Sequence, residues 1–381
     1  MEESETVVIG AGPAGLAVAA TLAARGHRAL VLEQADAVAA SWRSHYERLH
    51  LHTVKSLSAL PGMAFPAQAP RYVPRQGVVD YLEAYARRAA IAPRFGEEVT
   101  AVVRDGDGWR TETRAGHAFR SRFVVVATGA NRIANVVAIA GEDAFAGTIV
   151  HSRDYRNATP FAQRRVLVVG MGNTGAEVAL DLAEHGVAVA LSVRSPVNVV
   201  LRDVLGRPTQ QTSIVLGRLP RRLGDALASF FANVTVRDLE QLGLRRSPIS
   251  PLRALREHGR TPVIDVGTLA RIRAGQIAVR PGIRRLVADG AEFVDGSIDR
   301  FDAIVLATGY RADVDALFPG VAVKLDKNGL PRDAVGEGAL AGVSFVGFDT
   351  RQPGGLLRTI AAQATEVAER ICSASARAVP P

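Results

Sequence analysis

Two parts of the chain repeat one order of apolar, glycine-rich and alanine-rich residues. Residues 6–10, TVVIG, form a short β-branched run that leads into AGPAG, and the stretch from about 14 to 25 then has the composition of a helix. Gly26 suits the left-handed position after a helix, and residues 28–33, RALVLE, predict a second buried strand. The same order recurs over residues 165–194, beginning with RVLVVG. The pattern therefore predicts two βαβ units of the kind that nucleotide-binding folds use.

Two further apolar runs end in the same tripeptide. FVVVATG at 123–129 and DAIVLATG at 302–309 predict buried strands whose small last residues lie at the carboxyl edge of a parallel sheet, where open α/β folds bind ligands. Between about 196 and 262 the pattern becomes amphipathic and is interrupted by prolines, which predicts a helical insertion. A last helix is expected from about 355 to 372, followed by a frayed tail. The expected fold class is α/β with two Rossmann-like nucleotide-binding domains.

The composition is that of a folded globular protein with more than one domain. The chain has 381 residues, of which 48% are hydrophobic and 22% charged, so it can bury large cores. Its only cysteine is Cys372, which excludes an intramolecular disulfide, a cysteine-based metal site and a CxxC redox pair. A thiol–disulfide reductase is therefore excluded.

The net charge is positive but does not indicate a polyanion partner. Lys and Arg number 46 and Asp and Glu 38, a difference of +8. The arginines are scattered or occur in short pairs such as Arg221-Arg222 and Arg245-Arg246, whereas nucleic-acid-binding proteins usually gather them in a dense stripe. No apolar run approaches the roughly 18 residues of a membrane span, and the N-terminus opens with acidic residues, unlike a signal peptide. We therefore expect a cytoplasmic protein with neither a nucleic-acid nor a membrane partner.

The first glycine turn has the sequence of a dinucleotide-binding loop. In Gly10-Ala11-Gly12-Pro13-Ala14-Gly15 the first glycine allows a tight turn, the second lets a pyrophosphate approach the backbone, and the third lets the helix pack on the strand. Glu33 ends the next predicted strand, 23 residues after Gly10, where a carboxylate accepts hydrogen bonds from ribose hydroxyls. The motif predicts nucleotide binding, with a purely structural glycine turn as the alternative.

The second glycine turn, Gly170-Met171-Gly172-Asn173-Thr174-Gly175, differs at the end of its following strand. Arg194, followed by Ser195, stands 24 residues after Gly170, at the place equivalent to Glu33. A guanidinium attracts a 2′-phosphate that a carboxylate would repel, and it can stack on adenine. This difference favours NADPH over NADH, with an ordinary solvated arginine as the alternative.

Two dinucleotide sites in one chain, one with an acid and one with an arginine, predict FAD together with NADPH, because hydride passes from one ring to the other. The chain has no cysteine pair or metal cluster that could relay the electrons further. They must therefore leave to O₂ or directly to a small substrate. The sequence thus predicts a flavoenzyme.

A stretch between the two glycine turns matches a family fingerprint. Residues 145–156, FAGTIVHSRDYR, fit the pattern FxGxxxHxxx[YF][KR] and resemble the flavin-containing monooxygenases. The ending Tyr155-Arg156 differs from the Trp-Pro or Trp-Asp ending typical of Baeyer–Villiger monooxygenases, so the resemblance favours the former branch. Within the fingerprint, His151 is either a brace at the domain junction or a proton carrier.

Four further stretches are similar to the plant YUCCA-type flavin monooxygenases and their bacterial relatives. They are ASWR at 40–43, YERLHLHTVK at 46–55, GRTPVIDVGT at 259–268 and ATGY at 307–310. The resemblance spans nearly the whole chain. It implies an NADPH- and FAD-dependent monooxygenase that forms a C4a-(hydro)peroxyflavin and inserts one oxygen atom of O₂ into a small organic substrate. The plant enzymes decarboxylate indole-3-pyruvate oxidatively to indole-3-acetate, so a 2-oxo acid of this kind is a candidate substrate.

Three other functions stay open at this point. One is a flavin monooxygenase that hydroxylates nitrogen or sulfur, and another is an NADPH oxidase or reductase that inserts no oxygen. The third is a non-catalytic nucleotide-sensing module, which the completeness of both glycine motifs disfavours. An oxidase or reductase would not need the fingerprint at 145–156.

The motifs and the resemblance also imply a domain organisation. We expect an FAD-binding domain formed by 1–158 and 298–381, into which an NADPH-binding domain, 159–297, is inserted, with the helical insertion at about 196–262. The expected partners are a small-molecule substrate and O₂, and a homodimer is a candidate assembly.

The candidate site residues come from the same two sources. In the YUCCA-type LxLHxxK stretch, His52 stands where other flavin monooxygenases have an asparagine beside the reactive flavin edge, and it is a candidate catalytic residue together with Lys55 and Asn131. Gly355, before the last helix, would let the helix N-terminus approach the flavin, with a plain turn as the alternative. The candidate cofactor-binding residues are Gly10, Gly12, Pro13, Ala14, Gly15, Glu33, Gln34, Trp42, Arg43, His52, Val99, Ala127, Thr128, Gly129, Gly170, Gly172, Asn173, Thr174, Arg194, Ser195, Thr308, Gly309, Tyr310 and Gly355.

The sequence departs from the family pattern where substrate contacts are expected. Ala130-Asn131 replaces the usual Glu-Asn after the first ATG, and residues 196–250 match less well than their flanks. Residues 347–355 keep their glycines but change the residues between them. The cofactors carry over with the resemblance, but the exact substrate does not.

Overall fold

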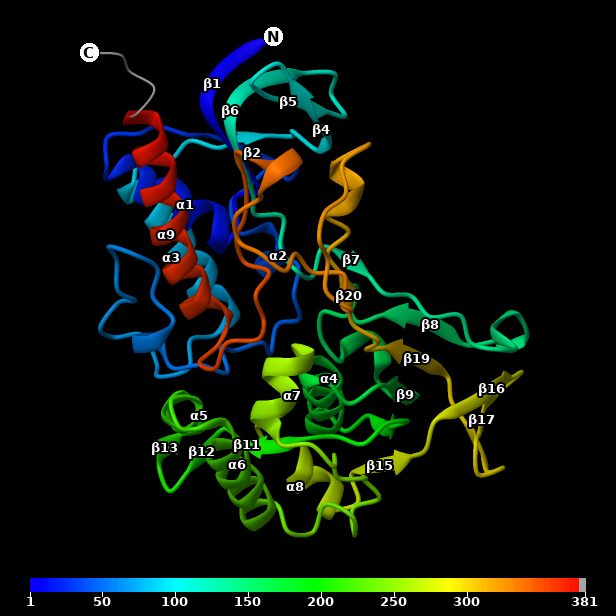
Figure 1. Ribbon diagram of the computed structural model, residues 1–381. Coiled ribbons are helices and arrows are strands. Elements are labelled where there is room, and N and C mark those ends of the chain that lie inside the picture. Colours follow the sequence, from blue (N-terminus) through cyan, green and yellow to red (C-terminus); the bar gives the residue numbers. More distant parts are fainter. Residues whose placement is uncertain (377–381) are drawn as a thin grey trace. The chain divides into compact units, whose positions relative to one another are not determined.

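The computed structural model describes residues 1–376, and the chain forms two compact units (Figure 1). The first unit comprises Met1–Arg43, Thr53–Ile133 and the described residues from 310 onward, and the second comprises Ser44–His52 and Ala134–Gly309. Residues 377–381, the end of the expected frayed tail, lie outside the described residues. Each unit is therefore built from segments that are far apart in the sequence.

The sheet of the first unit contains the first predicted βαβ pattern. Its strands lie in the order β3-β2-β1-β6-β5-β4, and β21 also pairs with β6. The strands β1, β2, β3, β6 and β21 are parallel, whereas β4, β5 and β6 form an antiparallel meander. The bounds are β1 Glu2–Ile9, β2 Leu30–Glu33, β3 Arg94–Phe95, β4 Val99–Asp105, β5 Gly108–Thr113, β6 Ala118–Val126 and β21 Val343–Phe345. The predicted strands 6–10, 28–33 and 123–129 are thus neighbours in one sheet, with their carboxyl ends at the same edge.

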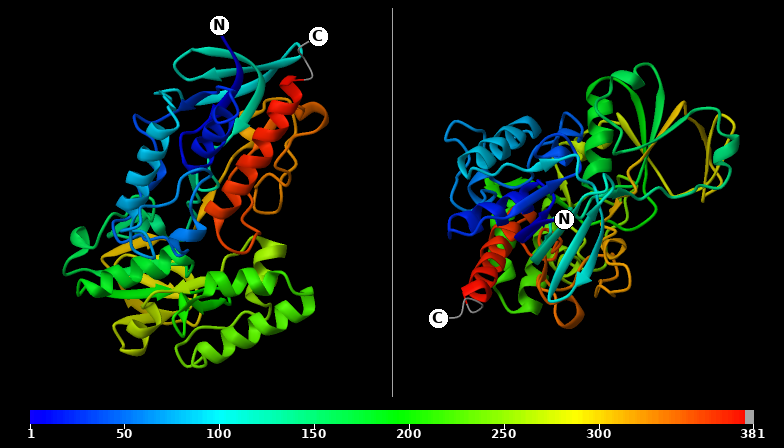
Figure 2. Two further views of the ribbon diagram at one scale, coloured as in Figure 1. Left: turned by 90° about the vertical axis from the view of Figure 1, so that its left-hand side faces the viewer. Right: turned by 90° about the horizontal axis from the view of Figure 1, so that it is seen from above.

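Three helices pack together in the first unit. Helix α1 (Pro13–Ala23) contacts both α3 (Arg75–Arg88) and α9 (Leu356–Ala376), and Figure 2 shows α1 and α9 side by side. Alanine and glycine on α1 allow this close packing, and Leu16 and Leu22 are fully buried. The short helix α2 spans Ala40–Arg43. Helix α9 continues four residues beyond its expected end at 372, and no helix within residues 1–376 is long and apolar enough to cross a membrane.

The second unit has a five-stranded parallel sheet in the order β15-β10-β9-β19-β8. Its strands are β8 Thr148–His151, β9 Arg165–Val169, β10 Ala188–Ser192, β15 Ile277–Arg280 and β19 Ala303–Leu306. Helix α4 (Asn173–Glu184) connects β9 to β10, as the second βαβ pattern predicts, and α8 spans Thr268–Arg273. A separate antiparallel sheet is formed by β16 Ile283–Val287, β17 Gly290–Phe293 and β18 Ile298–Arg300. Near-continuous apolar runs such as 303–306 are buried, as expected for strands covered on both faces.

The insertion between β10 and β15 is mainly helical but also contains short strands. Its helices are α5 Thr209–Gly217, α6 Arg221–Thr235 and α7 Pro251–His258. Its strands are β11 Val199–Leu201, β12 Asp203–Val204, β13 Arg207–Pro208 and β14 Val263–Asp265, with β11 paired to β14 and β12 to β13. The prolines that interrupt the sequence pattern precede or begin all three helices, where the absence of a backbone N–H costs little.

The two units divide the chain differently from the expected junctions at 158/159 and 297/298. Strand β8 lies before the first expected junction and β19 after the second, yet β19 pairs with both β8 and β9. Hydrogen bonding within one sheet therefore places 134–158 and 298–309 in the second unit. At the dividing residues, β7 (Ile133–Ala134) and β20 (Tyr310–Arg311) form a two-stranded ribbon.

Candidate functional site

The first glycine loop has the geometry that its sequence predicts. Gly10 has φ +108°, and a Cβ there would lie 2.6 Å from the carbonyl oxygen of Ala127, so a larger residue would be both strained and obstructed. A Cβ on Gly15 would overlap the carbonyl oxygen of Gly10. Gly12 differs from both, because its Cβ position has no protein atom within 4 Å. The loop thus leaves open space beside the first turn of α1, which begins at Pro13.

Glu33 is fixed next to this loop. It is the last residue of β2 and is buried, and its carboxylate accepts hydrogen bonds from the backbone N–H of Ala11 (2.7 Å) and of Ala35 (3.0 Å). The two amides hold the carboxylate in one orientation and satisfy part of its hydrogen-bonding capacity. Gln34 follows it and is exposed. An acidic group is therefore presented beside the open space at Gly12.

The end of β6 lies beside the same loop and carries an unsatisfied hydroxyl. Ala127 donates its N–H to Ile9 O (2.9 Å), and the buried Oγ1 of Thr128 has no hydrogen-bond partner within the described part of the chain. A buried hydroxyl without a partner is costly, so Thr128 is suited to a ligand group. Gly129 follows at positive φ, and Asn131 is exposed.

Four other candidates of the first unit contribute mainly to its own packing. Arg43 donates Nε to Val38 O (3.0 Å) and pairs with Glu83, while Trp42 beside it is half-buried. Val99 is buried at the start of β4. Gly355 stands immediately before α9, and a Cβ there would lie 2.6 Å from Cγ2 of Thr53. The close approach of these two segments requires glycine at this position.

The Lys55 ammonium forms hydrogen bonds with a nearby loop of the first unit. Its ammonium donates to the carbonyl oxygens of Pro66 (3.2 Å), Ala67 (2.6 Å) and Ala69 (2.5 Å). Three acceptors match the three N–H groups of an ammonium. These bonds hold the loop 66–69 against the start of the 3₁₀ turn at Lys55–Leu57.

The second glycine loop repeats the geometry of the first. Gly170 has φ +102°, and a Cβ there would lie 2.8 Å from Ala307 O, whereas the Cβ position of Gly172 has no protein atom within 4 Å. Asn173, the first residue of α4, donates Nδ2 to Pro262 O (3.2 Å) and accepts from the N–H of Ile264 (2.7 Å). Asn173 therefore attaches the loop to β14, and Thr174 follows in the same helical turn.

Arg194 lies just after β10 and is exposed, as is Ser195. Its aliphatic stem passes close to Gly282, where a Cβ would lie 3.2 Å from Cγ of Arg194. Arg245 donates a hydrogen bond to the backbone carbonyl of Arg194, so two guanidinium-bearing residues meet at this point. No acid of residues 1–376 forms an ion pair with Arg194. The pair concentrates positive charge beside the second loop, and sequence analysis had no signal for Arg245 beyond its Arg-Arg doublet.

The second ATG is held by a residue that the sequence analysis missed. Asn135 donates Nδ2 to Thr308 O (3.2 Å), accepts from Thr308 Oγ1 at its own carbonyl (2.6 Å), and donates its N–H to Gly309 O (2.9 Å). Tyr310 follows as the first residue of β20 and is half-buried. Asn135 stands in no motif of the sequence, and only the fold shows that it lies opposite the tripeptide.

His151 ends β8 and is buried. Its Nδ1 accepts a hydrogen bond from the N–H of Arg153 (3.1 Å). Burial lowers the pKa of His151, and the charge of Arg153 lowers it further. The imidazole is therefore neutral at ordinary pH, which suits a brace better than a carrier of protons near neutrality.

His52 contacts the helix that follows the second glycine loop. Its Nε2 meets Oε1 of Glu177, a side chain that is only 3% exposed. The acids Glu177, Asp181 and Glu184 recur at helical spacing along α4. Asp181 accepts from the hydroxyl of Tyr155 (2.5 Å), and Glu184 accepts from both Nε and Nη2 of Arg48 (3.0 and 2.9 Å).

This row of acids on α4 was not identified from the sequence. Their spacing of four and three residues was visible, but such acids usually face solvent. Here His52 covers Glu177 and the fingerprint residue Tyr155 covers Asp181, and both acids are buried. Burial and the hydrogen bond to Asp181 raise the pKa of Tyr155 far above its ordinary value, so its phenol stays a donor.

A polar cavity of about 440 Å³ lies in the first unit. Its lining includes Asp349, Gln352, Arg358 and Gln363, from the segment before α9 and from α9 itself. Burial acts to raise the pKa of Asp349, but hydrogen bonds from Arg351 and Gln352 outweigh it and hold that pKa below its usual range. Part of this lining comes from residues 347–355, where the sequence departs from the family pattern.

Comparison with known proteins gives the family. Residues 7–204 match the family described as pyridine nucleotide-disulphide oxidoreductase. The chain is 42% identical over 312 residues to the indole-3-pyruvate monooxygenase YUCCA1 of Oryza sativa subsp. japonica, a match that covers 81% of this chain and 77% of that one. It is 38% identical over 372 residues to the probable indole-3-pyruvate monooxygenase YUCCA1 of Arabidopsis thaliana, covering 96% and 89% of the two chains. The chain belongs to the YUCCA-type flavin monooxygenases.

Solved structures show the same fold at lower identity. The flavin-containing monooxygenase from Stenotrophomonas maltophilia superposes with a TM-score of 0.76 at 22% identity, over 98% of this chain and 100% of that one. The open structure of cyclohexanone monooxygenase gives a TM-score of 0.74 at 19% identity, over 99% and 88% of the two chains. These likenesses confirm the predicted fold class, α/β with two nucleotide-binding units.

Membership of the YUCCA-type family confirms an oxidoreductase and monooxygenase that depends on FAD and NADPH and acts with O₂ on a small molecule. The structure fits both cofactors, because each glycine loop leaves open space at its second glycine and Thr128 has an unsatisfied hydroxyl. The single cysteine, Cys372, provides no dithiol, so the disulphide chemistry in the broader family's description has no basis here.

Proposed function

We propose that this YUCCA-type enzyme acts on a 2-oxo acid such as indole-3-pyruvate and decarboxylates it oxidatively. The observation that carries the proposal is the 38–42% identity to relatives named for this activity, over 81–96% of the chain. The overall reaction would convert a 2-oxo acid, O₂, NADPH and a proton into the acid one carbon shorter, CO₂, NADP⁺ and water. One oxygen atom of O₂ would enter the new carboxylate.

For FAD, we propose the first glycine loop and the groups beside it. The backbone at Gly12 and the N-terminus of α1 would receive the pyrophosphate, and the Glu33 carboxylate would accept from the adenosine ribose. Glu33 is already oriented by two backbone amides, so little rotamer freedom would be lost on binding. Thr128 would donate its unsatisfied hydroxyl. When bound, FAD and NADPH supply hydride transfer and the activation of O₂.

For NADPH, we propose the second glycine loop with Arg194 and Ser195. The open position at Gly172 would admit the pyrophosphate. Arg194 would bind the 2′-phosphate, and Arg245 would add a second positive charge beside it. The anchoring of Asn173 to β14 would keep the loop in the binding geometry.

The catalytic roles of His52, Lys55 and Asn131 stay predictions from the resemblance. For His52, the contact with Glu177 supports a positioned imidazole rather than a mobile one. For Lys55, a catalytic role would require the ammonium to give up at least one of its three carbonyl acceptors. Asn131 is exposed, so it is accessible to a substrate. A homodimer and a cytoplasmic location also remain predictions.

The experiment that tests the substrate class follows the oxygen atom. The purified holoenzyme is supplied with NADPH, indole-3-pyruvate and ¹⁸O₂, and the products are analysed by mass spectrometry. The proposal expects indole-3-acetate with one ¹⁸O in its carboxylate and one NADPH consumed per acid formed. Hydrogen peroxide can decarboxylate 2-oxo acids without an enzyme, so catalase is present throughout.

Two results would overturn the proposal. NADPH oxidation without labelled acid, for indole-3-pyruvate and for other 2-oxo acids, together with stoichiometric peroxide in parallel reactions without catalase, would indicate an oxidase. Labelled products from amines or sulfides, together with none from 2-oxo acids, would indicate an N- or S-hydroxylating enzyme.

A further inference from the structure

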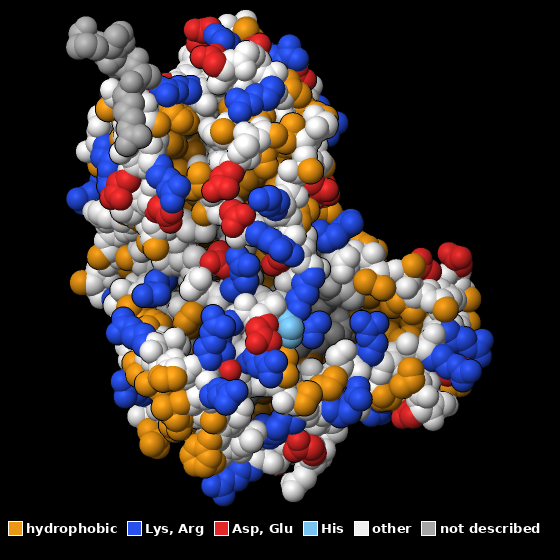
Figure 3. Space-filling model, viewed as in Figure 1, with side chains coloured by type: hydrophobic (Ala, Val, Ile, Leu, Met, Phe, Trp, Pro, Cys, Tyr) orange, Lys and Arg blue, Asp and Glu red, His pale blue; other side chains and the backbone are white. Residues whose placement is uncertain are grey.

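Helix α6 carries an unpartnered apolar face. Leu223, Phe230, Phe231 and Val234 are 49%, 58%, 43% and 40% exposed. Spacings of seven and four residues place Leu223, Phe230 and Val234 on one stripe of the helix, with Phe231 beside it. Figure 3 shows hydrophobic side chains gathered at the lower left of the molecule, over α5 and α6, with Lys and Arg side chains around them. We call these four residues the α6 face.

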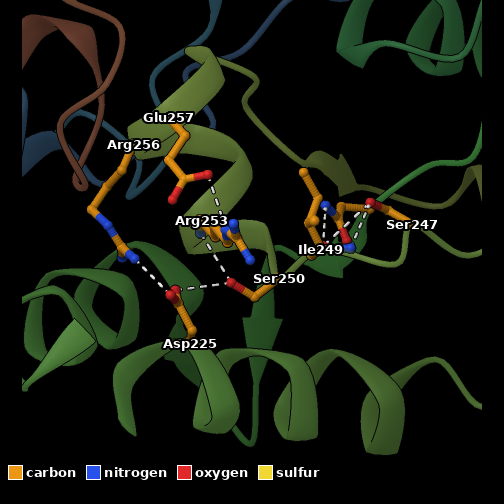
Figure 4. A network of polar contacts seen from close by, with 8 residues as sticks. Asp225, Ser247, Ile249, Ser250, Arg253, Arg256 and Glu257 are labelled. Atoms are coloured by element: carbon orange, nitrogen blue, oxygen red, sulfur yellow. Dashed lines mark hydrogen bonds and ion pairs between the residues drawn. The ribbon is translucent and has the colours of Figure 1, made fainter. Parts of the chain in front are cut away.

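The opposite side of α6 is fixed to the rest of the insertion. Gly224 packs against α5, where a Cβ would lie 2.5 Å from Leu216 O, and Ala228 and Ala232 are buried. Asp225 accepts from Ser250 Oγ (2.9 Å) and from Nη2 of Arg256 (2.7 Å), as Figure 4 shows.

The network around Asp225 continues into α7 (Figure 4). Ser250 caps α7 by accepting the N–H of Arg253 (3.0 Å), and Arg253 pairs with Glu257 (2.9 Å). Because these polar contacts hold α6 from its inner side, the helix cannot rotate to bury the α6 face without breaking them. The exposure is therefore a property of the folded insertion.

Positive charge flanks the α6 face at both ends. Arg218, Arg221 and Arg222 are exposed at the N-terminal end, and Arg237 is exposed just after the helix. Within 205–240 the acids are Asp225, Asp238 and Glu240. Each is paired with an arginine from outside this range: Asp225 with Arg256, Asp238 with Arg273 (2.6 Å) and Glu240 with Arg246 (3.4 Å). The four flanking arginines have no such acidic partner within residues 1–376.

We propose that the α6 face docks on the surface of a bilayer that contains anionic phospholipid. An amphipathic helix with phenylalanine and leucine on one side and arginine at its borders lies in the plane of the membrane interface, with its apolar residues inserted and its arginines against headgroup phosphates. The arginine stems also cover apolar surface while their guanidinium groups reach the phosphates. This binding is distinct from the monooxygenase reaction, because none of these residues belongs to the cofactor loops.

The same charges argue against a second copy of the chain as the occupant. In a two-fold dimer through the α6 face, an antiparallel arrangement would place Arg221 and Arg222 beside Arg237 of the other copy, and a parallel one would place each arginine cluster against itself. No acid on α6 is free to neutralise them, because Asp225 is bound by Arg256. An anionic surface attracts the flanking arginines, whereas the arginines of a second α6 face would repel them. The proposal revises the expectation of no membrane partner, which rested on the absence of a long apolar run.

Vesicle co-sedimentation tests the proposal with the full-length holoenzyme. The vesicles are phosphatidylcholine alone and phosphatidylcholine mixed with phosphatidylglycerol, each at low and high salt. We expect binding to the mixed vesicles, weakened by salt, and little binding to phosphatidylcholine alone. The double variant Phe230→Ser/Phe231→Ser should weaken binding by at least about tenfold, and Arg221→Gln/Arg222→Gln should weaken it and reduce its salt dependence.

Matched control variants remove exposed apolar or arginine side chains outside the α6 face. Val294→Ser/Ile298→Ser removes two apolar side chains that are 64% and 58% exposed, and Arg88→Gln/Arg164→Gln removes two exposed arginines. Both should bind vesicles as the natural sequence does, and all four variants should keep its far-ultraviolet circular dichroism and its rate of NADPH oxidation in solution. Absence of binding to the mixed vesicles would overturn the proposal. So would a Phe230→Ser/Phe231→Ser protein that changes from dimer to monomer in sedimentation equilibrium while vesicle binding is unaffected.

Discussion

His52 and Glu177 are 125 residues apart in the sequence, yet His52 Nε2 contacts Glu177 Oε1 in the folded second unit. The segment Ser44–His52 interrupts the first unit along the chain but folds with the second. Arg48 makes a second attachment, to Glu184 on the same helix. The acidic residues of α4 thus hold a segment that lies in the sequence between two parts of the first unit, Met1–Arg43 and Thr53–Ile133.

Glu177→Gln is expected to destabilise the protein by about 1–3 kcal/mol, because the imidazole of His52 loses a buried carboxylate as its hydrogen-bond partner. The measurement is urea unfolding of Glu177→Gln, His52→Gln and the double variant. A coupling energy between the two single changes would show that they act through each other. Strictly additive losses would contradict a direct interaction. Arg88→Gln, an exposed change on α3, is the control.

Tyr155→Phe should cost about 1–3 kcal/mol at neutral pH, because the buried carboxylate of Asp181 loses its donor. The pKa of Tyr155 is raised in the folded protein, so its contribution to stability is fully present below the unfolded pKa of about 10 and is lost as the pH rises above that value. The stability difference between the natural sequence and Tyr155→Phe should therefore shrink above that pH. Urea unfolding from neutral to alkaline pH measures this. A constant difference would refute the assignment of the raised pKa.

Arg194→Ala should raise the KM for NADPH by about ten- to a hundredfold, the loss expected for one charge-assisted contact to a phosphate. The KM for NADH should change little, because NADH has no 2′-phosphate. Steady-state kinetics with both nucleotides give the ratio. Arg164→Ala, an exposed arginine elsewhere in the second unit, should change neither value. Equal effects of Arg194→Ala on both nucleotides would exclude the 2′-phosphate role.

Gly12→Val separates flavin binding from folding. Gly12 has an ordinary extended φ of −82°, and no protein atom lies within 4 Å of its Cβ position, so the fold should tolerate valine while the space for a pyrophosphate is filled. The purified variant should be folded by circular dichroism but nearly colourless in flavin absorbance. Gly15→Val is the contrast, because its Cβ would overlap Gly10 O and should prevent folding. A folded Gly12→Val protein with full flavin content would refute the placement of FAD.

Much of the fold could be predicted because it rests on local patterns. The apolar runs that end at Gly10 and Gly170 and the acid or arginine after each second strand identify the two nucleotide-binding loops without any knowledge of long-range contacts. The domain junctions could not be predicted in this way. The strands 148–151 and 303–306 read as ordinary buried strands, and only their pairing with each other decides which sheet they complete.

The candidate site likewise contains residues that the sequence could predict and residues that it could not. Gly12, Gly172 and Glu33 could be predicted as candidates from the sequence, because the spacing of each glycine motif marks the two glycines and the end of the following strand marks the acid. Asn135 and Glu177 could not, since a lone asparagine between strands and an acid on a helix are common, and their partners lie 173 and 125 residues away.

The sequence by itself determined the two glycine loops, the acid or arginine after each following strand, and the family fingerprint. These features depend on backbone geometry and charge within short stretches of neighbouring residues. The tertiary structure alone decided that His52 meets Glu177, that β19 completes the second sheet and that the apolar side of α6 faces outward. Those features depend on side chains and strands brought together from distant parts of the chain, and the packing that selects them is a property of the whole fold.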